Sequence, residues 1–216
     1  MRASTSDYSR PNKTTDRVVL SYDGFSSYLL IIDKASRYAW VFLTTPKDPP
    51  IDIINEFFTQ HGHVEGGCVH TDQGGELARS AAFQDLMLQQ FHYSVEPTGA
   101  NSPSQNGAVE VYNGKFATRT RTLLYGSGLP AKFWSAALLH SVYLHNRLVH
   151  SDTKKTPFEG YYGIRPDLTA LRLFGSQIKA VGGRKKARCV CDGSMRSGMV
   201  RVLAETYANC VDQTSA

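Results

Sequence analysis

Two carboxylates in the sequence have neighbours and a spacing that suit metal-dependent chemistry. Asp72 follows the short apolar run Cys68–Thr71 and stands before a polar, glycine-rich turn. Glu110 follows a glycine-flanked loop and opens a helical pattern, with 37 residues between it and Asp72. That interval is long enough for a helix, a strand and a loop that return the chain to the same edge of a sheet. A strand end and a nearby helix would then hold the two carboxylates close together.

Carboxylates placed in this way suit phosphodiester chemistry. Mg²⁺ binds through a few carboxylate oxygens and keeps several waters, so its ligands need not form a dense local cluster. Two ions about 3.5–4 Å apart can activate a nucleophilic oxygen and stabilise the leaving oxygen. Each residue also has a structural interpretation, because Asp before Gly-Gly commonly forms a turn and Glu in a first helical turn complements the helix dipole. Composition and spacing alone predict only an α/β domain with a candidate metal site.

Strand and helix patterns alternate along the chain and would position these residues. Two apolar, aromatic and β-branched runs joined by the turn KASR predict a hairpin of strands over 28–33 and 38–44. Apolar residues at helical spacing predict a helix over 51–61, which Gly62 ends. Further strands are predicted over 17–21, 68–71 and 93–97, further helices over 80–91, 108–126 and 130–148, and a loop over 98–107. This order is typical of an α/β layer fold with a mixed sheet.

The composition is that of a globular protein. The 216 residues are 41% hydrophobic, 11% aromatic and 20% charged, which is enough for a core. The sequence holds no run of about 18 apolar residues that would span a membrane. Four cysteines, three of them near the C-terminus, argue against a secreted disulfide scaffold, so we expect an intracellular protein. The net charge of +5 lies mostly in residues 178–216, where 7 Lys and Arg face 3 Asp and Glu, so charge alone indicates DNA binding only weakly.

Five motifs follow one another in a fixed order: TDQGGEL, SPSQNGAVE, LPAKFWSAALLHSVYLHNRLVH, KTPFEGYYGIRPDL and LRLFGSQ. Together they resemble the integrase core of copia-type LTR retrotransposons. That family's pattern runs T-D-N-G-G-E-F, T-P-Q-x-N-G-x-x-E, L-P-x-x-F-W-x-x-A, N-R-x-P, T-P-x-E, K-P-x-L and L-R-x-F-G. The upstream stretch YLLIIDKASRYAWVFL is similar to the family's D-x-x-S-R hairpin, in which Asp33 would be a turn residue. The resemblance covers about residues 25–177.

The resemblance implies an RNase H-like fold with a mixed five-stranded sheet flanked by helices. It also implies DNA integration by polynucleotidyl transfer, in which a metal-bound hydroxyl attacks a DNA phosphodiester, with Mg²⁺ or Mn²⁺ as cofactor. Asp72 matches the second catalytic aspartate of the family and Glu110 its glutamate, so both are implied to be catalytic metal ligands. Asn106 and Gly107 match the flexible loop before the glutamate, which approaches DNA in the family.

Three basic residues follow Glu110 on the same predicted helix. Lys115, Arg119 and Arg121 are candidate phosphate contacts, and the alternative is a solvated helix face. The partners implied by the resemblance are the DNA ends of the element, the target DNA and further copies of the chain. No membrane is implied, and a functional protein of this kind would be nuclear.

The first catalytic aspartate of the family has no secure match. Asp16 stands 17 residues before Asp33, which is a tolerable spacing, but NKTTDRVVLS lacks the family's context. Asp7 is a weaker alternative. We prefer a third interpretation, in which the residue is encoded upstream of Met1. Two carboxylates without the third would bind metal poorly, and the chain would then be inactive.

The chain divides into three parts on this interpretation. Residues 1–16 are predicted to be a poorly ordered N-terminal segment, residues 17–177 an integrase core-like domain, truncated if its first strand is missing, and residues 178–216 a basic tail that is disordered or aberrant. The leading function is an integrase core, intact or degenerate. The alternatives are a non-catalytic nucleic-acid-binding remnant and a gene-model fragment of a retroelement polyprotein. Whether the chain is an enzyme depends on the missing carboxylate.

Overall fold

A mixed β-sheet lies at the centre of the fold in the computed structural model. The structure describes the following parts of the chain: residues 2–7, 19–45, 49–61, 67–71, 76–97, 103–169 and 171–176. The strands are β1 (Arg2–Asp7), β2 (Ser27–Ile32), β3 (Ala39–Thr44), β4 (Cys68–Thr71) and β5 (Ser94–Pro97), in the order β3-β2-β1-β4-β5 across the sheet. β2 pairs antiparallel with β3, and β4 pairs parallel with β5. β1 joins these two pairs, because it lies antiparallel to β2 and parallel to β4.

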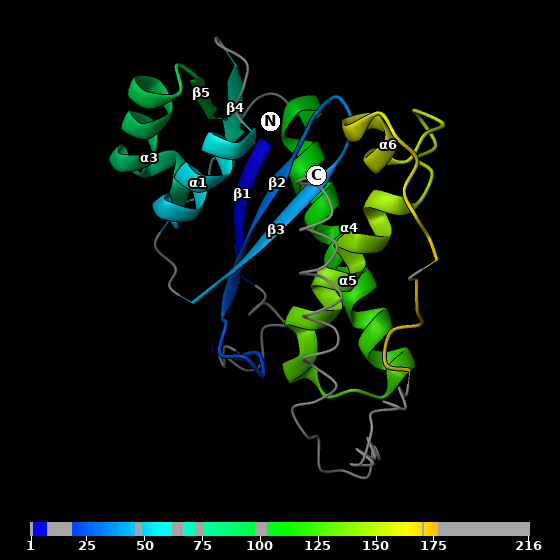
Figure 1. Ribbon diagram of the computed structural model, residues 1–216. Coiled ribbons are helices and arrows are strands. Elements are labelled where there is room, and N and C mark those ends of the chain that lie inside the picture. The colour runs from blue at the N-terminus through cyan, green and yellow to red at the C-terminus, as the bar shows by residue number, and fades with distance from the viewer. Residues whose placement is uncertain are drawn as a thin grey trace, which may run out of the picture.

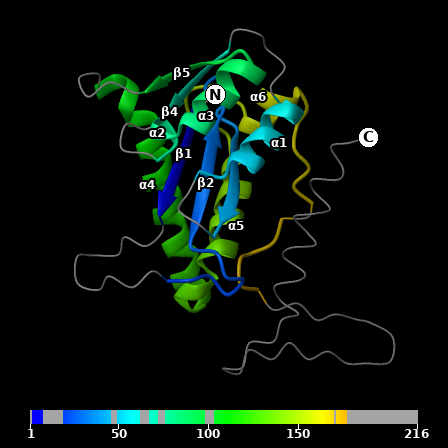
Figure 2. The ribbon, with the colours of Figure 1, turned by 90° about the vertical axis from the view of Figure 1, so that its left-hand side faces the viewer.

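The helices cover both faces of this sheet. They are α1 (Ile51–His61), α2 (Glu76–Arg79), α3 (Ala81–Asp85), the π-helical turn η1 (Leu86–Gln90), α4 (Pro103–Ser127), the 3-10 turn η2 (Ala131–Phe133), α5 (Trp134–Arg147) and α6 (Pro157–Tyr162). α4 and α5 lie on one side of the strands, and α1 and α3 lie on the other (Figure 1). The view turned by 90° shows the same layers from the side (Figure 2). The predicted mixed α/β class is confirmed.

Strand β2 is buried on both faces, which explains its unbroken apolar sequence. Leu30 and Ile32 belong to the core against α4 and α5, together with Phe116 and Trp134. Leu29 and Ile31 belong to the opposite core, against α1, α3 and η1. Successive side chains of a strand point to opposite faces, so a strand between two helical layers needs apolar residues at every position.

Two predictions for the N-terminal part of the chain differ from the structure. Residues 2–7 form a strand within the sheet, although the sequence predicted a poorly ordered segment there. The strand predicted over 17–21 is wrong where it is described, because residues 19–21 have no regular structure. Instead, Val19 accepts a hydrogen bond of 3.0 Å from the Trp134 indole nitrogen, and Tyr22 stacks on Phe133. The backbone of Val19 and the ring of Tyr22 therefore contact the start of α5 and the turn before it, whereas the side chains of Val19 and Leu20 are exposed.

Two local motifs set the ends of elements. Asp33 Oδ2 accepts hydrogen bonds from the backbone N–H and the hydroxyl of Ser36, at 2.8 and 2.7 Å, and so closes the turn between β2 and β3. Thr156 caps α6 by accepting the backbone N–H of Glu159 at 3.0 Å, with Pro157 in the first helical turn. The structural role predicted for Asp33 is confirmed. No helix within the described ranges is long and apolar enough to cross a membrane.

Candidate functional site

Strand β4 leads to the first candidate carboxylate. It ends at Thr71, which is 1% exposed, and Asp72 is the next residue in the sequence. β4 lies between β1 and β5 and pairs parallel with both. Asp72 itself lies outside the described residues. In the sequence it follows directly on an inner strand of the sheet.

Glu110 lies on α4, but deeper in the helix than its sequence context predicts. The helix begins at Pro103, so the backbone of Asn106 and Gly107 is helical, and the predicted loop over 98–107 is wrong from residue 103 onward. Proline at the start of a helix is favourable, and a glycine within it costs about 1 kcal/mol. Packing of Tyr112 and Phe116 on the sheet offsets that cost. The side chains of residues 103–110 lie outside what the structure describes.

The sheet side of α4 is marked by a side-chain contact one turn after Glu110. Tyr28 on β2 has its hydroxyl 3.5 Å from Asn113 Oδ1. Asn113 therefore lies on the side of α4 that meets the sheet. Tyr28 pairs with Ser6 of β1, and α4 also contacts β1 directly. α4 therefore packs against β1, and β1 lies beside β4 in the sheet.

The structure describes the backbone of one of the two candidates for the first carboxylate. Asp16 lies outside the described residues. Asp7 is the last residue of β1, the strand beside β4, and it is the only acidic residue in that strand. The chain therefore contains a strand in the place where we expected one to be encoded upstream. A β1 strand of residues 2–7 lacks the strong apolar pattern of a buried strand, which is why the sequence did not reveal it.

The three predicted phosphate contacts differ in their surroundings. Lys115 is exposed on α4, with its ammonium 5.1 Å from the centre of the Tyr112 ring. Arg119 shares that face but is half-buried, and its Nη1 is a buried atom without a hydrogen-bond partner among the described residues. Arg121 is exposed on another face, with Nη2 3.5 Å from Thr118 Oγ1. The three residues do not form one stripe, and their contact with phosphate stays a prediction.

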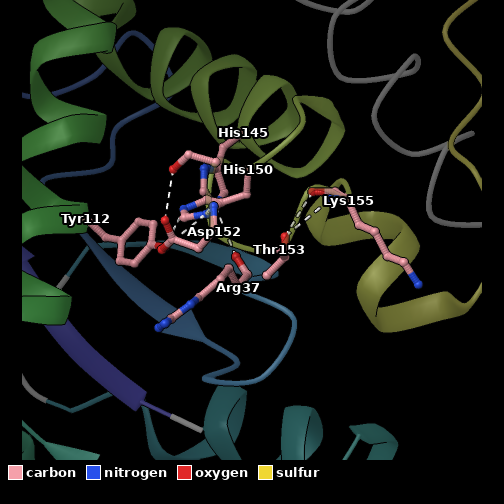
Figure 3. Close-up of polar contacts among 8 residues, drawn as sticks. Arg37, Tyr112, His145, His150, Asp152, Thr153 and Lys155 are labelled. Carbon is pink, nitrogen blue, oxygen red and sulfur yellow. Dashed lines mark hydrogen bonds and ion pairs between the residues drawn. The ribbon is translucent and has the colours of Figure 1, made fainter.

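A polar cluster beside Lys115 and Arg119 was not foreseen. His145 on α5 donates a hydrogen bond of 3.0 Å from Nε2 to the carbonyl of Arg37 in the β2–β3 turn. Tyr112 Oη lies 3.3 Å from Nε2 of His150 (Figure 3). These contacts join residues more than 30 positions apart in sequence, so no local pattern predicts them. They hold α4, α5 and the β2–β3 turn together.

Burial lowers the pKa of His145 in this cluster, so its contribution to stability depends on pH. Burial, with smaller effects from the charges of Arg119, His150 and Lys115, lowers the pKa of His145 to about 4, although its bond to Arg37 acts in the opposite direction. A lowered folded-state pKa means that the unfolded chain binds the proton first. Stability from His145 is therefore complete above about pH 6.5 and is lost as the pH falls toward 4.

The His145→Gln variant should lose less stability than the parent between pH 6.5 and pH 4. Glutamine keeps a nitrogen donor near the carbonyl of Arg37 but does not titrate. The difference between the two proteins has an upper bound of about 3 kcal/mol and is measured by denaturant unfolding at each pH. His92→Asn is the matched control, because His92 is exposed and asparagine tolerates its positive φ. Equal pH slopes in the parent and His145→Gln would contradict this prediction.

The donor chemistry of the two carboxylates fits a hard divalent ion. Carboxylate oxygens are ligands that Mg²⁺ and Mn²⁺ prefer. The fold is an α/β domain. Asp72 follows the end of the inner strand β4 in the sequence, and Glu110 lies on the helix α4 that covers the sheet.

Comparison with known proteins specifies this class further. The Retrovirus-related Pol polyprotein from transposon RE2 of Arabidopsis thaliana is 26% identical over 163 residues, which are 73% of this chain and 11% of the relative. The corresponding polyprotein from transposon RE1 of the same plant is 26% identical over 164 residues, with the same coverage of 73% and 11%. The polyprotein from transposon TNT 1-94 of Nicotiana tabacum is 29% identical over 133 residues, 59% of this chain and 10% of the relative. No family model matches the chain.

Solved structures show the same fold. The integrase catalytic core domain of HTLV-2, in a trimeric form with magnesium, matches with a TM-score of 0.50 and 18% identity, over 74% of this chain and 93% of that one. A simian T-cell lymphotropic virus intasome in complex with the PP2A regulatory subunit B56 gamma matches with a TM-score of 0.56 and 18% identity, over 85% of this chain and 59% of that one. The chain therefore has the RNase H-like fold of integrase cores, and it is similar to segments that make up 10–11% of the length of plant retrotransposon Pol polyproteins. The predicted resemblance is confirmed.

Proposed function

We propose that this chain is the catalytic core of a retrotransposon integrase and carries out DNA strand transfer by metal-dependent polynucleotidyl transfer. The observation that carries the proposal is the placement of α4 against β1, beside the strand that ends directly before Asp72. The substrates would be the DNA ends of the element and the target DNA. The protein would act as an assembly of several copies in the nucleus. Asp72, Glu110 and Asp7 would be the carboxylates of the site.

In this reaction a DNA hydroxyl oxygen attacks a target phosphorus. The attacking hydroxyl gives up its proton, a new P–O bond forms, an existing phosphodiester P–O bond breaks, and the leaving oxygen takes up a proton. Divalent ions, when bound, supply electrostatic stabilisation of the attacking and leaving oxygens. The role of the protein is to hold carboxylates at fixed positions and to bind the DNA backbone. Exposed Lys115 and Arg121 are the described residues of the predicted set that are free to approach phosphate oxygens.

The Asp72→Asn, Glu110→Gln double variant tests this proposal. Mn²⁺-dependent joining of an oligonucleotide end to target DNA should fall by roughly 10³-fold or more, because two metal-binding charges are removed without a change of shape. The matched control is the Glu56→Gln, Asp85→Asn variant, in which two exposed carboxylates on α1 and α3 are neutralised in the same way. Activity that persists in the double variant would show that the assigned site is wrong.

One observation favours a second function, a non-catalytic DNA-binding domain. Ala3 of β1 pairs with Thr71, so an extended continuation of β4 would put position 72 level with Ser4. Ser4 is not a carboxylate, and Asp7 is three residues farther along, about 10 Å at 3.3 Å per residue. The second function predicts DNA binding that weakens with salt and is unaffected when EDTA removes divalent ions. Binding that depends on the metal would count against it.

A further inference from the structure

We propose that Cys68, His70 and Glu96 form a binding site for a divalent transition-metal ion of the Zn²⁺ class on strands β4 and β5. Each residue offers one ligand atom, and the three atoms lie within 4.8 Å of one another. Cys68 Sγ is 3.7 Å from His70 Nε2, and His70 Nδ1 is 3.4 Å from Glu96 Oε2. The proposal does not depend on the function proposed above.

The strand register explains why these three side chains meet. Cys68 and His70 are two residues apart on β4 and so share a face of the sheet. Glu96 pairs with His70 across the parallel β4–β5 ladder, and β5 is an edge strand. The alternate residues Val69 and Thr71 are buried toward the opposite side. The cluster therefore lies on the less buried face, with the Glu96 side chain 61% exposed.

The distances are close to those that a tetrahedral ion requires. With Zn–S near 2.3 Å and Zn–N near 2.0 Å, sulfur and nitrogen ligands lie about 3.5 Å apart. The Cys68–His70 pair is already near that separation. One imidazole binds an ion through one nitrogen, and Glu96 contacts Nδ1 of His70 whereas Cys68 contacts Nε2. The exposed Glu96 side chain must therefore rotate to reach an ion held by Sγ of Cys68 and Nε2 of His70. The fourth position would then be open to water, as in zinc sites that are not closed by protein ligands.

The chemistry of this ligand set differs from that of the carboxylate site. A thiolate, an imidazole and one carboxylate select Zn²⁺, Co²⁺ or a similar ion, whereas Mg²⁺ prefers oxygen ligands alone. An ion held here would cross-link the edge strand β5 to β4, the strand that ends directly before Asp72. The sequence contains one part of this signal, the alternation Cys68-Val69-His70. It contains no indication that Glu96, on another strand, would be the third ligand.

Titration with Co²⁺ tests the site through a signal that oxygen ligands cannot produce. The protein used is the full chain with Cys189, Cys191 and Cys210 replaced by Ser, so that Cys68 is the sole thiol. A thiolate bound to Co²⁺ gives a charge-transfer absorption band in the near ultraviolet. We expect this band to saturate at one equivalent, to disappear on addition of Zn²⁺ and to persist in excess Mg²⁺.

Variants of the three ligands then distinguish a three-ligand metal site from metal binding by the Cys68 thiol alone. Cys68→Ser should abolish the band, and His70→Asn and Glu96→Gln should each weaken the apparent affinity by roughly tenfold or more. Glu56→Gln, an exposed glutamate on α1, is the matched control and should leave the affinity unchanged. Because Glu96 is exposed, its variant should remain folded, and Zn²⁺ should raise the unfolding temperature of the parent by more than that of Glu96→Gln. Absence of the band in the parent, or an affinity in Glu96→Gln and in His70→Asn equal to that of the parent, would overturn the proposal.

Discussion

Asp7→Asn should reduce Mn²⁺-dependent strand transfer by roughly 10³-fold or more, whereas Asp16→Asn should leave it within about twofold of the parent. Asp7 is the only acidic residue in β1, and β1 lies beside β4 in the sheet. Asparagine has nearly the shape of aspartate without its charge, so the variant tests metal binding rather than packing. Asp16 is the matched control because it was the alternative that sequence spacing favoured.

The register of β1 against β4 limits how Asp7 and Asp72 could bind metal together. Asp7 lies four residues beyond Ala3, which pairs with Thr71, or about 13 Å along the strand. A site for two divalent ions would let two carboxylates at different levels of the sheet each hold one ion. Asp7 would therefore hold one ion and Asp72 the other. Calorimetric titration should accordingly show that Asp7→Asn loses one of two bound Mn²⁺ equivalents.

The opposite pattern would support the non-catalytic function. If Asp7→Asn had no effect and Ser4→Asp created or raised activity, the third carboxylate position would be that of Ser4. The chain would then have a serine where catalysis needs a metal ligand. The two substitutions lie three residues apart on one strand. A comparison of their strand-transfer activities would therefore show which residue of β1 lies beside Asp72.

Three of the motifs that carried the resemblance have structural roles in the fold. Asp33 and Ser36 close the β2–β3 turn, Thr156 and Glu159 cap α6, and Trp134 bonds to the backbone of Val19. Such motifs work through contacts within a few residues or through burial, so sequence patterns can express them. This is why the strands β2 to β5, the helices α1 and α5 and the fold class could be predicted with nearly correct limits.

The features that the sequence did not predict depend on long-range pairing. β1 owes its place to neighbours on both sides, which is a tertiary effect that outweighs its weak propensity. The first turns of α4 were assigned to a loop because Asn106 and Gly107 are loop residues by local preference, and packing farther along the helix overrides that preference. Glu96 meets His70 only through the β4–β5 register. Local composition contains no information about any of these pairings.

Asn146→Ala should lower the free energy of unfolding by roughly 2–4 kcal/mol, since two buried backbone groups would lose their partner. The amide of Asn146 bonds to both backbone groups of Ala39: Oδ1 accepts its N–H at 2.9 Å, and Nδ2 donates to its carbonyl at 2.8 Å. Asn146 is 4% exposed, so water cannot easily replace it. Denaturant unfolding measures the loss. Asn55→Ala is the matched control, because Asn55 also bonds across elements, to Gln90, but at an exposed site.

Asn146→Asp distinguishes this two-way hydrogen bond from simple packing. The aspartate has the shape of asparagine and keeps one acceptor for the N–H of Ala39, but its second oxygen would face the carbonyl of Ala39 and repel it. A protonated carboxyl can donate to that carbonyl, so part of the lost stability should return relative to Asn146→Ala when the pH falls below the pKa of the introduced carboxyl. A variant as stable as the parent at neutral pH would show that the donor half of the contact contributes nothing. The start of β3 would then be held by packing and by the bond that position 146 accepts, and the choice of asparagine over aspartate at the end of α5 would need another explanation.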